Sequence, residues 1–373
     1  MNGHGNGQAV PSFEGSYIVF ELTNLCNLRC KHCIQQYDIH PHTDDGGFLD
    51  PTIFYAALED MERHGLAFHT LILFWIGEPL MHPKFAELYR FVLEFNARAK
   101  VFRKVEVHTN GNLLRPAVRD LATNDTDSIF QVWHCTIDAS RADTYVGIKG
   151  KNDFALVESN VRELVKLRAE KRSLYPKLVF QFIVHEANAA EAPEFQARWQ
   201  GECRAHGLDC GAAAFHPVFD RDNCVFFRQL DCLDAREQEA SNVRYVDLMR
   251  SLGLIGEDRR SIVDRLRSKI LTPNTHTCSG FFKSPVVNWD GRVTTCTRDN
   301  EMVNVLGDLR TETFHDVWWR NQKLAAWRQQ AIDGTYRDLS ICQDCIIPKS
   351  ANYTNMTKAE VKAYRRWSSR ANT

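Results

Sequence analysis

The stretch "ELTNLCNLRCKHC", residues 21–33, places three cysteines in the spacing C-x3-C-x2-C directly after an apolar segment, "SYIVFELT" (16–23). A tetrahedral metal site takes four ligands, and this stretch offers three thiols, those of Cys26, Cys30 and Cys33. In an iron–sulfur cubane held by thiolates, three cysteines leave one iron without a protein ligand. The spacing therefore indicates either a zinc site completed by His32 or a distant cysteine, or a cluster that keeps one iron for a substrate or cofactor.

Length and composition predict an ordinary folded protein with a large core. The chain has 373 residues, 44% of them hydrophobic, which suggests one large domain with a smaller one. A net charge of −1 and the lack of a long basic run argue against a nucleic-acid partner. Residues 1–15 lack the features of a signal peptide, and no apolar run is long enough to span a bilayer. We therefore expect a flexible leader over 1–15, a cytoplasmic protein and no membrane partner.

Twelve cysteines in a chain without a signal peptide indicate metal or redox chemistry rather than disulfides. Seven of them form patterned sets, namely the triplet, a pair at 278 and 296, and a C-x2-C at 342 and 345. The other five are scattered and have the character of small buried hydrophobic residues. The scattered cysteines are Cys135, Cys203, Cys210, Cys224 and Cys232.

Residues 16–216 alternate short apolar runs with amphipathic segments, which is typical of β-α units around a parallel sheet. Asp50 and Pro51 open one of the helix patterns, and Gly65 ends it. Six such units are too few to close an eight-stranded barrel, so the pattern predicts an α/β fold with a partial (β/α)6, TIM-like barrel whose strand C-termini line a cavity. The six predicted strands are 16–23, 70–77, 104–111, 130–138, 177–185 and 208–216.

The remainder of the chain has a different pattern. Residues 217–277 are charged and helical in pattern, which predicts an insertion or bridge that could determine substrate specificity. Residues 278–347 contain a hairpin signal at Asp290-Gly291 followed by a helix pattern, which predicts a small, separate α+β module. A tail helix is expected within 348–373.

The cysteine loop resembles the cluster loop of the radical S-adenosylmethionine (SAM) superfamily, in which C-x3-C-x2-C follows the first strand of a partial barrel. In that family SAM chelates the open iron, and reduction of the cluster cleaves SAM to methionine and a 5′-deoxyadenosyl radical that abstracts hydrogen from the substrate. The resemblance implies a [4Fe-4S] cluster on the catalytic Cys26, Cys30 and Cys33, with SAM as its ligand. It also implies an external one-electron reductant of the flavodoxin or ferredoxin type, and a backbone contact from His32 to the cofactor.

Two further loops carry the resemblance. "WIGEP" resembles the family turn that holds the SAM amino group, with Gly77 and Glu78 in place and Ile76 where the family has a first glycine. A carboxylate only accepts hydrogen bonds, as an ammonium group requires. "HTNG" resembles a third-strand ending of the family and implies that Asn110 reaches the cavity.

The ends of the fourth and fifth predicted strands supply the remaining candidate cofactor residues. "CTIDAS" resembles the family pattern Ser-x-Asp-Gly, which implies Thr136 for the SAM ribose and Asp138 as a catalytic residue facing SAM or substrate. "FIVHEAN" implies Asn188 near the adenine. The alternative for Thr136, Asp138 and Asn188 is a role in a turn or a cap.

The C-terminal cysteines form a second candidate metal centre. Cys278, Cys296, Cys342 and Cys345 supply four thiols, and by spacing alone they suit either a structural zinc or an iron–sulfur cluster. Their order resembles the twitch module, the short form of the SPASM extension, which carries one auxiliary [4Fe-4S] cluster. No cysteine follows Cys345, which disfavours the full SPASM form with two auxiliary clusters.

A fully ligated auxiliary cluster has no open iron, so its useful role is electron transfer. The layout resembles twitch-type dehydrogenases such as the aminocyclitol dehydrogenase of butirosin biosynthesis, and implies oxidation of a small sugar-like, aminocyclitol or nucleoside-like molecule. Redox-neutral epimerisation or decarboxylation is an alternative, and epimerisation would need a hydrogen donor such as the thiol of Cys210 or Cys224. Maturation of ribosomal peptides and a non-enzymatic zinc-stabilised binding protein are further alternatives.

Overall fold

The computed structural model describes residues 10–33, 46–124, 128–214, 223–232, 235–255, 277–336, 339–343, 345 and 355–371. The described residues form one sheet of ten strands in the order β10-β9-β8-β1-β2-β3-β4-β5-β7-β6. Predictions for residues 1–9, 215–222, 256–276 and 346–354 lie outside the described residues.

The strands are short and mostly parallel. Among the described strands, only the pairs β8–β9 and β9–β10 are antiparallel. The strands are β1 (Tyr17–Phe20), β2 (Phe68–Ile72), β3 (Phe102–Thr109), β4 (Phe130–Thr136), β5 (Lys177–Val184), β6 (Cys210–Ala214), β7 (Asn223–Gln229), β8 (Val286–Val287), β9 (Arg292–Thr294) and β10 (Gly307–Asp308).

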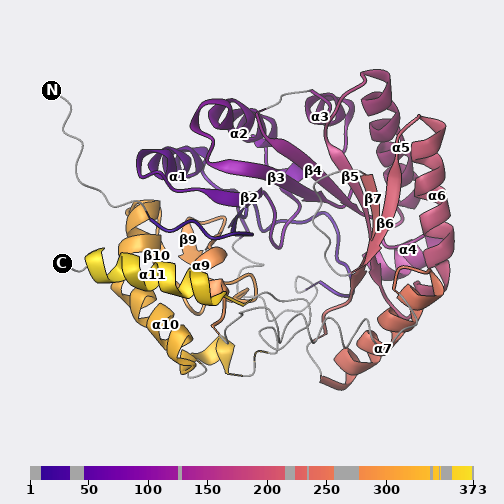
Figure 1. The fold of residues 1–373 in the computed structure, drawn as a ribbon. Helices are drawn as coiled ribbons and strands as arrows, with labels where there is room; N and C mark the ends of the chain where they lie inside the picture. Colours follow the sequence, from indigo (N-terminus) through magenta and orange to yellow (C-terminus); the bar gives the residue numbers. More distant parts are fainter. Residues whose placement is uncertain are drawn as a thin grey trace.

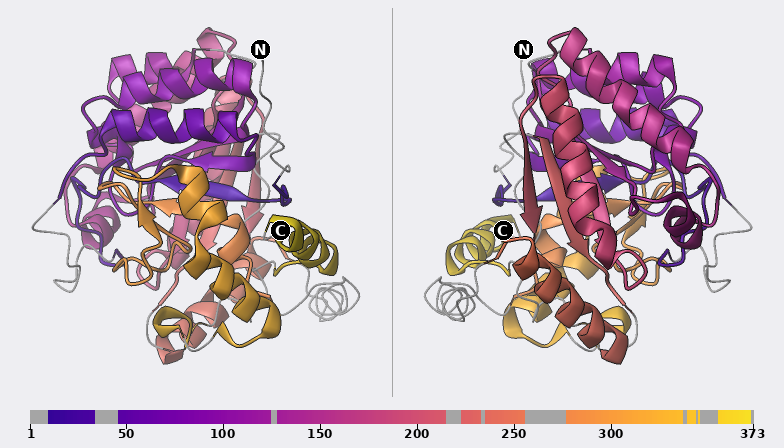
Figure 2. Two further views of the ribbon diagram at one scale, coloured as in Figure 1. Left: turned by 90° about the vertical axis from the view of Figure 1, so that its left-hand side faces the viewer. Right: turned by 90° about the vertical axis from the view of Figure 1, so that its right-hand side faces the viewer.

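Helices follow the strands as expected for β-α units. The main ones are α1 (Pro51–Arg63), α2 (Phe85–Ala99), α3 (Pro116–Ala122), α4 (Ala142–Lys149), α5 (Phe154–Glu170), α6 (Ala192–Ala205), α7 (Ala235–Ser251), α9 (Gly280–Lys283), α10 (Gln322–Asp333) and α11 (Lys358–Ala371). Helices α1, α2, α3, α5 and α6 lie along the outer side of the curved sheet (Figure 1), and Figure 2 shows this layer from both ends. The prediction of a partial, TIM-like α/β barrel is confirmed.

Local sequence explains how α1 begins and ends. The Asp50 side chain accepts a hydrogen bond from the Thr52 amide at 2.9 Å, and Pro51 occupies the first helical position. Gly65 follows the last turn with φ +62°, a conformation that favours glycine. The sequence prediction for this helix is confirmed.

The sheet has two chemically distinct faces because side chains alternate along each strand. Val105, Val107, Trp133 and Phe180 pack into the core under the outer helices. Their neighbours on the other face form a smaller apolar cluster, Val132, Val179 and Phe226, with polar residues beside it. This second, concave face is the interior of the partial barrel.

The predicted sixth strand is an edge strand, and the strand beside it corrects the helical insertion predicted over residues 217–277. Residues 210–214 form β6, but the neighbour of β5 is β7, residues 223–229, which were predicted to belong to a helical insertion. The run Val225-Phe226-Phe227 is fully apolar and buried between charged flanks, so it pairs as a short core strand. The described part of the segment therefore contains a barrel strand followed by α7.

The predicted C-terminal module joins the sheet of the barrel directly. Strand β8 pairs in parallel with β1, with Val19 opposite Val286 and Phe20 opposite Val287. The Asp290-Gly291 hairpin is present between β8 and β9, as predicted, and it extends the same sheet. The two cysteine centres therefore lie on one continuous framework.

Candidate active site

The cysteine loop lies at the end of β1 and is held by neighbouring elements. The Lys31 amide donates to the carbonyl of Ile148 in α4 at 2.9 Å. From the end of β3, the Asn110 amide group donates to Asn27 Oδ1 at 2.7 Å and lies 3.8 Å from Cys26 Sγ. Cys26, Cys30 and Cys33 are all half-buried thiols. The loop therefore gathers three thiols at the carboxyl-end rim of the sheet.

Gly77 lies against this loop so closely that no other residue fits. A Cβ at this position would lie 2.0 Å from the carbonyl oxygen of Thr23 and 2.7 Å from that of Leu25. The next amide, of Glu78, donates to the Leu25 carbonyl at 2.8 Å. The turn after β2 and the cysteine loop thus form one unit, which explains the glycine in "WIGEP".

The Glu78 carboxylate is buried and already has three hydrogen-bond donors. Thr109 Oγ1 and the backbone amide of Leu80 donate to Oε1 at 2.8 and 3.2 Å. The backbone amide of Asn110 donates to Oε2 at 2.7 Å. Burial outweighs these donors and raises the pKa of Glu78 to about 7. A carboxylate offers about four acceptor positions, so one remains for an ammonium group.

Asp138 forms a buried ion pair with Lys149, a residue that the sequence analysis missed. Lys149 Nζ lies 2.5 Å from Asp138 Oδ2, and the Ile183 amide donates to Oδ1 at 2.6 Å. Burial alone would raise the pKa of Asp138, but the Lys149 ammonium group holds it below its usual value. Both side chains are almost fully buried. The geometry favours Asp138 as a positioning residue for Lys149 over direct contact with a ligand.

Lys149 itself faces the cysteine loop. Its charge lowers the pKa of the Cys30 thiol, whereas burial, the larger effect, raises it. Burial and the Glu78 carboxylate likewise raise the pKa of Cys26 to about 12. Bound iron ions would keep such thiols ionised, because metal binding stabilises the thiolate. The donor set therefore fits a metal cluster.

His32 and His185 form a second contact between the loop and the strand ends. Their ring centroids lie 4.8 Å apart, and His32 Nδ1 and His185 Nε2 are buried without a hydrogen-bond partner among the described residues. Burial lowers the pKa of His32 to about 3. Buried polar atoms usually have partners, so these two orphaned nitrogens fit a ligand at this rim.

Asn188 and Thr136 differ in the hydrogen-bonding capacity that they leave available for a ligand. The Asn188 amide group donates to the carbonyls of Asp138 and Ile183, and its oxygen accepts from the His185 amide. This full use favours the turn role of Asn188 over an adenine contact. Thr136 Oγ1 accepts from Gln181 Nε2 at 3.1 Å and keeps its own proton to donate.

The concave face carries a polar row that the sequence analysis also missed. Lys104 Nζ lies 2.6 Å from Glu106 Oε1, and the His108 and His134 Nε2 atoms lie 3.3 and 3.8 Å from Glu106 Oε2. Burial would raise the pKa of Glu106, but the hydrogen bond from His108 and the neighbouring His134 and Lys104 hold it well below its usual range. Alternation along β3 could have placed these residues on one face, but not beside His134 of β4.

The second cysteine set is gathered at the β8–β9 hairpin. The charges of Cys278 and Cys345 both act on Cys296, and with burial, the largest effect, they raise its pKa to about 12. The Cys345 amide donates to the Cys342 carbonyl at 3.3 Å. All four are half-buried thiols, and four cysteine thiolates are enough to ligate one iron–sulfur cluster.

Two contacts join the rim of the barrel to this hairpin. The Glu21 carboxylate accepts from the Ile76 amide at 3.1 Å and from the Trp289 amide at 3.4 Å. Trp75 Nε1 donates to the carbonyl of Thr297, the residue after Cys296, at 3.1 Å. Burial raises the pKa of Glu21 to about 8. The turn after β2 and the β8–β9 hairpin are therefore joined by hydrogen bonds.

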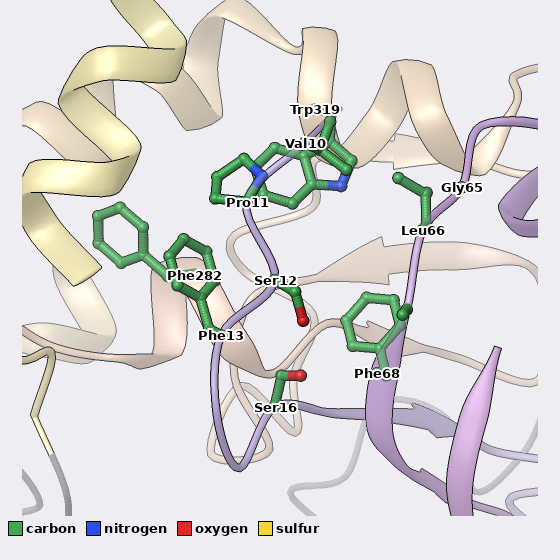
Figure 3. A pocket seen from close by; sticks show the side chains of 11 residues that line it. Val10, Pro11, Ser12, Phe13, Ser16, Gly65, Leu66, Phe68, Phe282 and Trp319 are labelled. Carbon is green, nitrogen blue, oxygen red and sulfur yellow. The ribbon is translucent and has the colours of Figure 1, made fainter. Parts of the chain in front are cut away.

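An apolar pocket lies at the amino-terminal ends of β1 and β2. Phe13, Phe68, Phe282 and Trp319 line it (Figure 3); Ser16, also in its lining, directly precedes β1, and Phe68 is the first residue of β2. In parallel α/β sheets, ligands bind at the carboxyl ends of strands. The pocket therefore lies away from the candidate site.

Comparison with known families agrees with this geometry. The chain matches the Radical SAM superfamily over residues 20–175 and the SPASM iron–sulfur cluster-binding domain over residues 278–346. It therefore contains a radical SAM domain and an SPASM domain. The first domain implies a [4Fe-4S] cluster and SAM, and the second implies auxiliary iron–sulfur chemistry, so the predicted cofactors are confirmed.

Two curated relatives are similar over part of their length. The chain is 28% identical over 182 residues to the tungsten-containing aldehyde ferredoxin oxidoreductase cofactor-modifying protein of Pyrococcus furiosus, covering 48% of this chain and 46% of the relative. It is 27% identical over 234 residues to the pre-heme d1 synthase of Dinoroseobacter shibae, covering 61% and 52%. The chain spans about half the length of these relatives.

Solved structures share the fold. BtrN in complex with AdoMet and 2-DOIA has a TM-score of 0.50 at 16% identity, covering 92% of this chain and 99% of BtrN. Streptococcus suis SuiB bound to precursor peptide SuiA has a TM-score of 0.56 at 11% identity, covering 94% and 76%. The anSMEcpe complex with AdoMet and a peptide has a TM-score of 0.55 at 13% identity, covering 95% and 97%.

No helix in the described parts of the chain is both long and apolar enough to cross a bilayer.

Proposed function

We propose that this enzyme reductively cleaves SAM at a [4Fe-4S] cluster on Cys26, Cys30 and Cys33, and oxidises a secondary alcohol of a small hydroxylated molecule. The observation that carries the proposal is the three-thiol loop at the carboxyl-end rim, directly beside a concave face lined with polar side chains. Cys278, Cys296, Cys342 and Cys345 would hold an auxiliary cluster, which would supply an acceptor for the electron that the substrate loses.

The residues around the loop are assigned roles by their remaining hydrogen-bonding capacity. Glu78 has one acceptor position left for the SAM ammonium group, and Thr136 has a proton left to donate to the ribose. Gly77 allows the turn to reach the loop. When bound, the cluster and SAM supply the 5′-deoxyadenosyl radical that removes a carbon-bound hydrogen atom. Lys149 places positive charge beside the Cys30 thiolate.

A small-molecule substrate is supported by the names of similar proteins. One relative modifies a cofactor, another is a synthase of pre-heme d1, and BtrN is solved with 2-DOIA. The electron source in this proposal is an external one-electron donor of the flavodoxin or ferredoxin type.

Redox-neutral epimerisation is a second candidate, and one observation favours it. Cys224 lies opposite Val179 in the β5–β7 register, and Val179 belongs to the concave-face cluster. Neighbouring residues in register share a face, so the Cys224 thiol lies on the side where a hydrogen-atom donor is needed. Cys210, in contrast, interacts with Cys203 of α6 on the outer side.

The test uses the reconstituted enzyme, dithionite and SAM with three probes deuterated at their carbinol carbons: an aminocyclitol, a hexose and a ribonucleoside. We expect deuterium in 5′-deoxyadenosine and one equivalent of ketone with at least one probe. Deuterium transfer that yields an inverted alcohol instead of a ketone would establish the epimerase, and this outcome should then require Cys224. Absence of deuterium transfer from all three probes would reject both candidates.

A further inference from the structure

The polar row on the concave face lies one step along β3 from the cluster loop. Asn110, whose amide contacts Cys26 Sγ, follows His108 by two residues, so their side chains share a face about 7 Å apart. The register places His134 directly opposite His108. The row is therefore within the reach of a small substrate that faces the loop.

The row is organised around one buried carboxylate. Lys104 Nζ forms an ion pair with Glu106 Oε1 at 2.6 Å, and His108 Nε2 lies 3.3 Å from Glu106 Oε2. Because an ionised carboxylate can only accept, His108 must donate its Nε2–H, and its Nδ1 atom then carries the lone pair. The orientation of an imidazole by a buried acid is the arrangement that makes histidine an effective base.

Aromatic stacking fixes the ring of His108. It lies between the rings of Phe74 and His134. The ring centroids of Phe74 and His108 are 5.0 Å apart with an interplanar angle of 4°, and those of His134 and His108 are 4.0 Å apart with an angle of 14°. The His108 side chain remains 16% exposed, whereas that of His134 is 2% exposed. Of the two histidines, His108 is therefore the one that an incoming substrate can reach.

The same atoms could also suggest a metal site, since Glu106, His108 and His134 place ligand atoms within 4.8 Å of one another. Two features oppose it. A metal ion lies about 2 Å from each imidazole nitrogen and close to each ring plane, which two nearly parallel rings 4.0 Å apart do not permit. The Lys104 ammonium group also already neutralises the carboxylate. The geometry suits a proton acceptor better.

We propose that His108, oriented by Glu106, is the base that accepts the hydroxyl proton of the substrate alcohol. This inference rests on the proposed dehydrogenation. After the carbinol hydrogen atom is removed, the O–H bond breaks and an N–H bond forms at His108 Nδ1. The substrate radical anion must then lose one electron to complete the C=O bond, and an auxiliary cluster held by Cys278, Cys296, Cys342 and Cys345 would supply the one-electron acceptor.

The test compares His108→Phe with the wild-type enzyme, using whichever deuterated probe the wild type oxidises. Phenylalanine keeps the stack and removes the base. We expect deuterium transfer to persist within the first turnover while ketone formation falls about 10²-fold or more, the usual contribution of a general base. Freeze-quench electron paramagnetic resonance should show accumulated substrate radical in the variant. In His108→Ala, added imidazole should restore ketone formation.

The chain offers a matched control in a second histidine stack. His64 lies at the end of α1, away from the candidate site. Its ring stacks on that of His315 with centroids 4.0 Å apart and an interplanar angle of 6°, and its Nδ1 atom lies 3.2 Å from Asp60 Oδ1. His64→Phe should leave ketone formation unchanged. Ketone formation by His108→Phe at the wild-type rate would overturn the proposal.

Loss of deuterium transfer together with ketone in a folded His108→Phe would also overturn it, since His108 would then serve binding alone. If no probe transfers deuterium to the wild type, the proposed function itself fails and the base role fails with it. The two failures are thus distinguishable.

Discussion

The two cysteine centres of this enzyme are built in different ways. The first takes three thiols from a single loop, residues 26–33, supported by the turn after β2, the end of β3 and α4. The second collects its thiols from residue 278 to residue 345, around a hairpin that adds to the same sheet. A centre made from one loop depends on local spacing, whereas a centre made from distant segments depends on correct tertiary pairing. The predictions below separate these two dependences.

Loss of one loop thiol should have the largest effect. Cys30→Ala leaves two thiols for the first cluster, so we expect SAM cleavage to be abolished and the iron content to fall from about eight to about four per chain. Iron analysis and 5′-deoxyadenosine formation after anaerobic reconstitution measure this. Cys135→Ala, which removes a thiol buried under the outer helices, is the control and should retain both. Cleavage by Cys30→Ala at the wild-type rate would contradict the assignment.

Loss of one thiol of the second centre should separate cleavage from turnover. Cys342→Ala should lose about four irons. Ketone formation should be strongly reduced, while 5′-deoxyadenosine continues to form without product, because the first centre is independent of this thiol. The ratio of the two products gives the result. Equal loss of both products in a protein that retains eight irons would show that Cys342 is not a ligand.

The ion pair behind the first centre should contribute mainly to stability. Asp138→Asn leaves the Lys149 ammonium group buried without its partner, which should lower the free energy of unfolding by about 3–5 kcal/mol. Asn tolerates the left-handed backbone at this position, φ +62°. Denaturant unfolding of the reconstituted protein measures the change. The double variant Asp138→Asn, Lys149→Met should recover much of the loss, and failure to do so would locate the effect elsewhere.

The bridge between the centres should give the smallest effect and a distinctive pH dependence. The pKa of Glu21 is raised to about 8 by burial, so the folded state binds its proton more tightly than the unfolded state. Its contribution to stability is therefore present at pH 4.5 and is lost as the pH rises through 8.

Glu21→Gln cannot titrate and leaves one of the two amides of Ile76 and Trp289 without an acceptor, at a cost of about 1–3 kcal/mol at low pH. The melting temperatures of the variant and the wild type should converge between pH 5 and pH 9. Parallel melting curves over that range would reject the role of Glu21 titration.

Residue patterns identified the parts of the site that depend on neighbours in sequence. The cysteine spacings, the alternation of strands and helices and the cap of α1 follow from local chemistry, and the turn at Gly77 and Glu78 was identified by its resemblance to a family motif. The sequence could also place Asp138 and Asn188 at strand ends, but not say what they contact. Asp138 pairs with Lys149 and Asn188 holds a turn because of groups on other elements.

By itself, the sequence therefore determined the family and the cofactors, through a resemblance carried by short motifs, and the fold class, through periodicity. Only the tertiary structure decided that residues 223–229 enter the sheet beside β5, that β8 joins the two centres in one sheet, and that Glu106 meets both His108 and His134. The physical reason is that alternation assigns a side chain to a face of its strand, but strand order and register decide which side chains become neighbours.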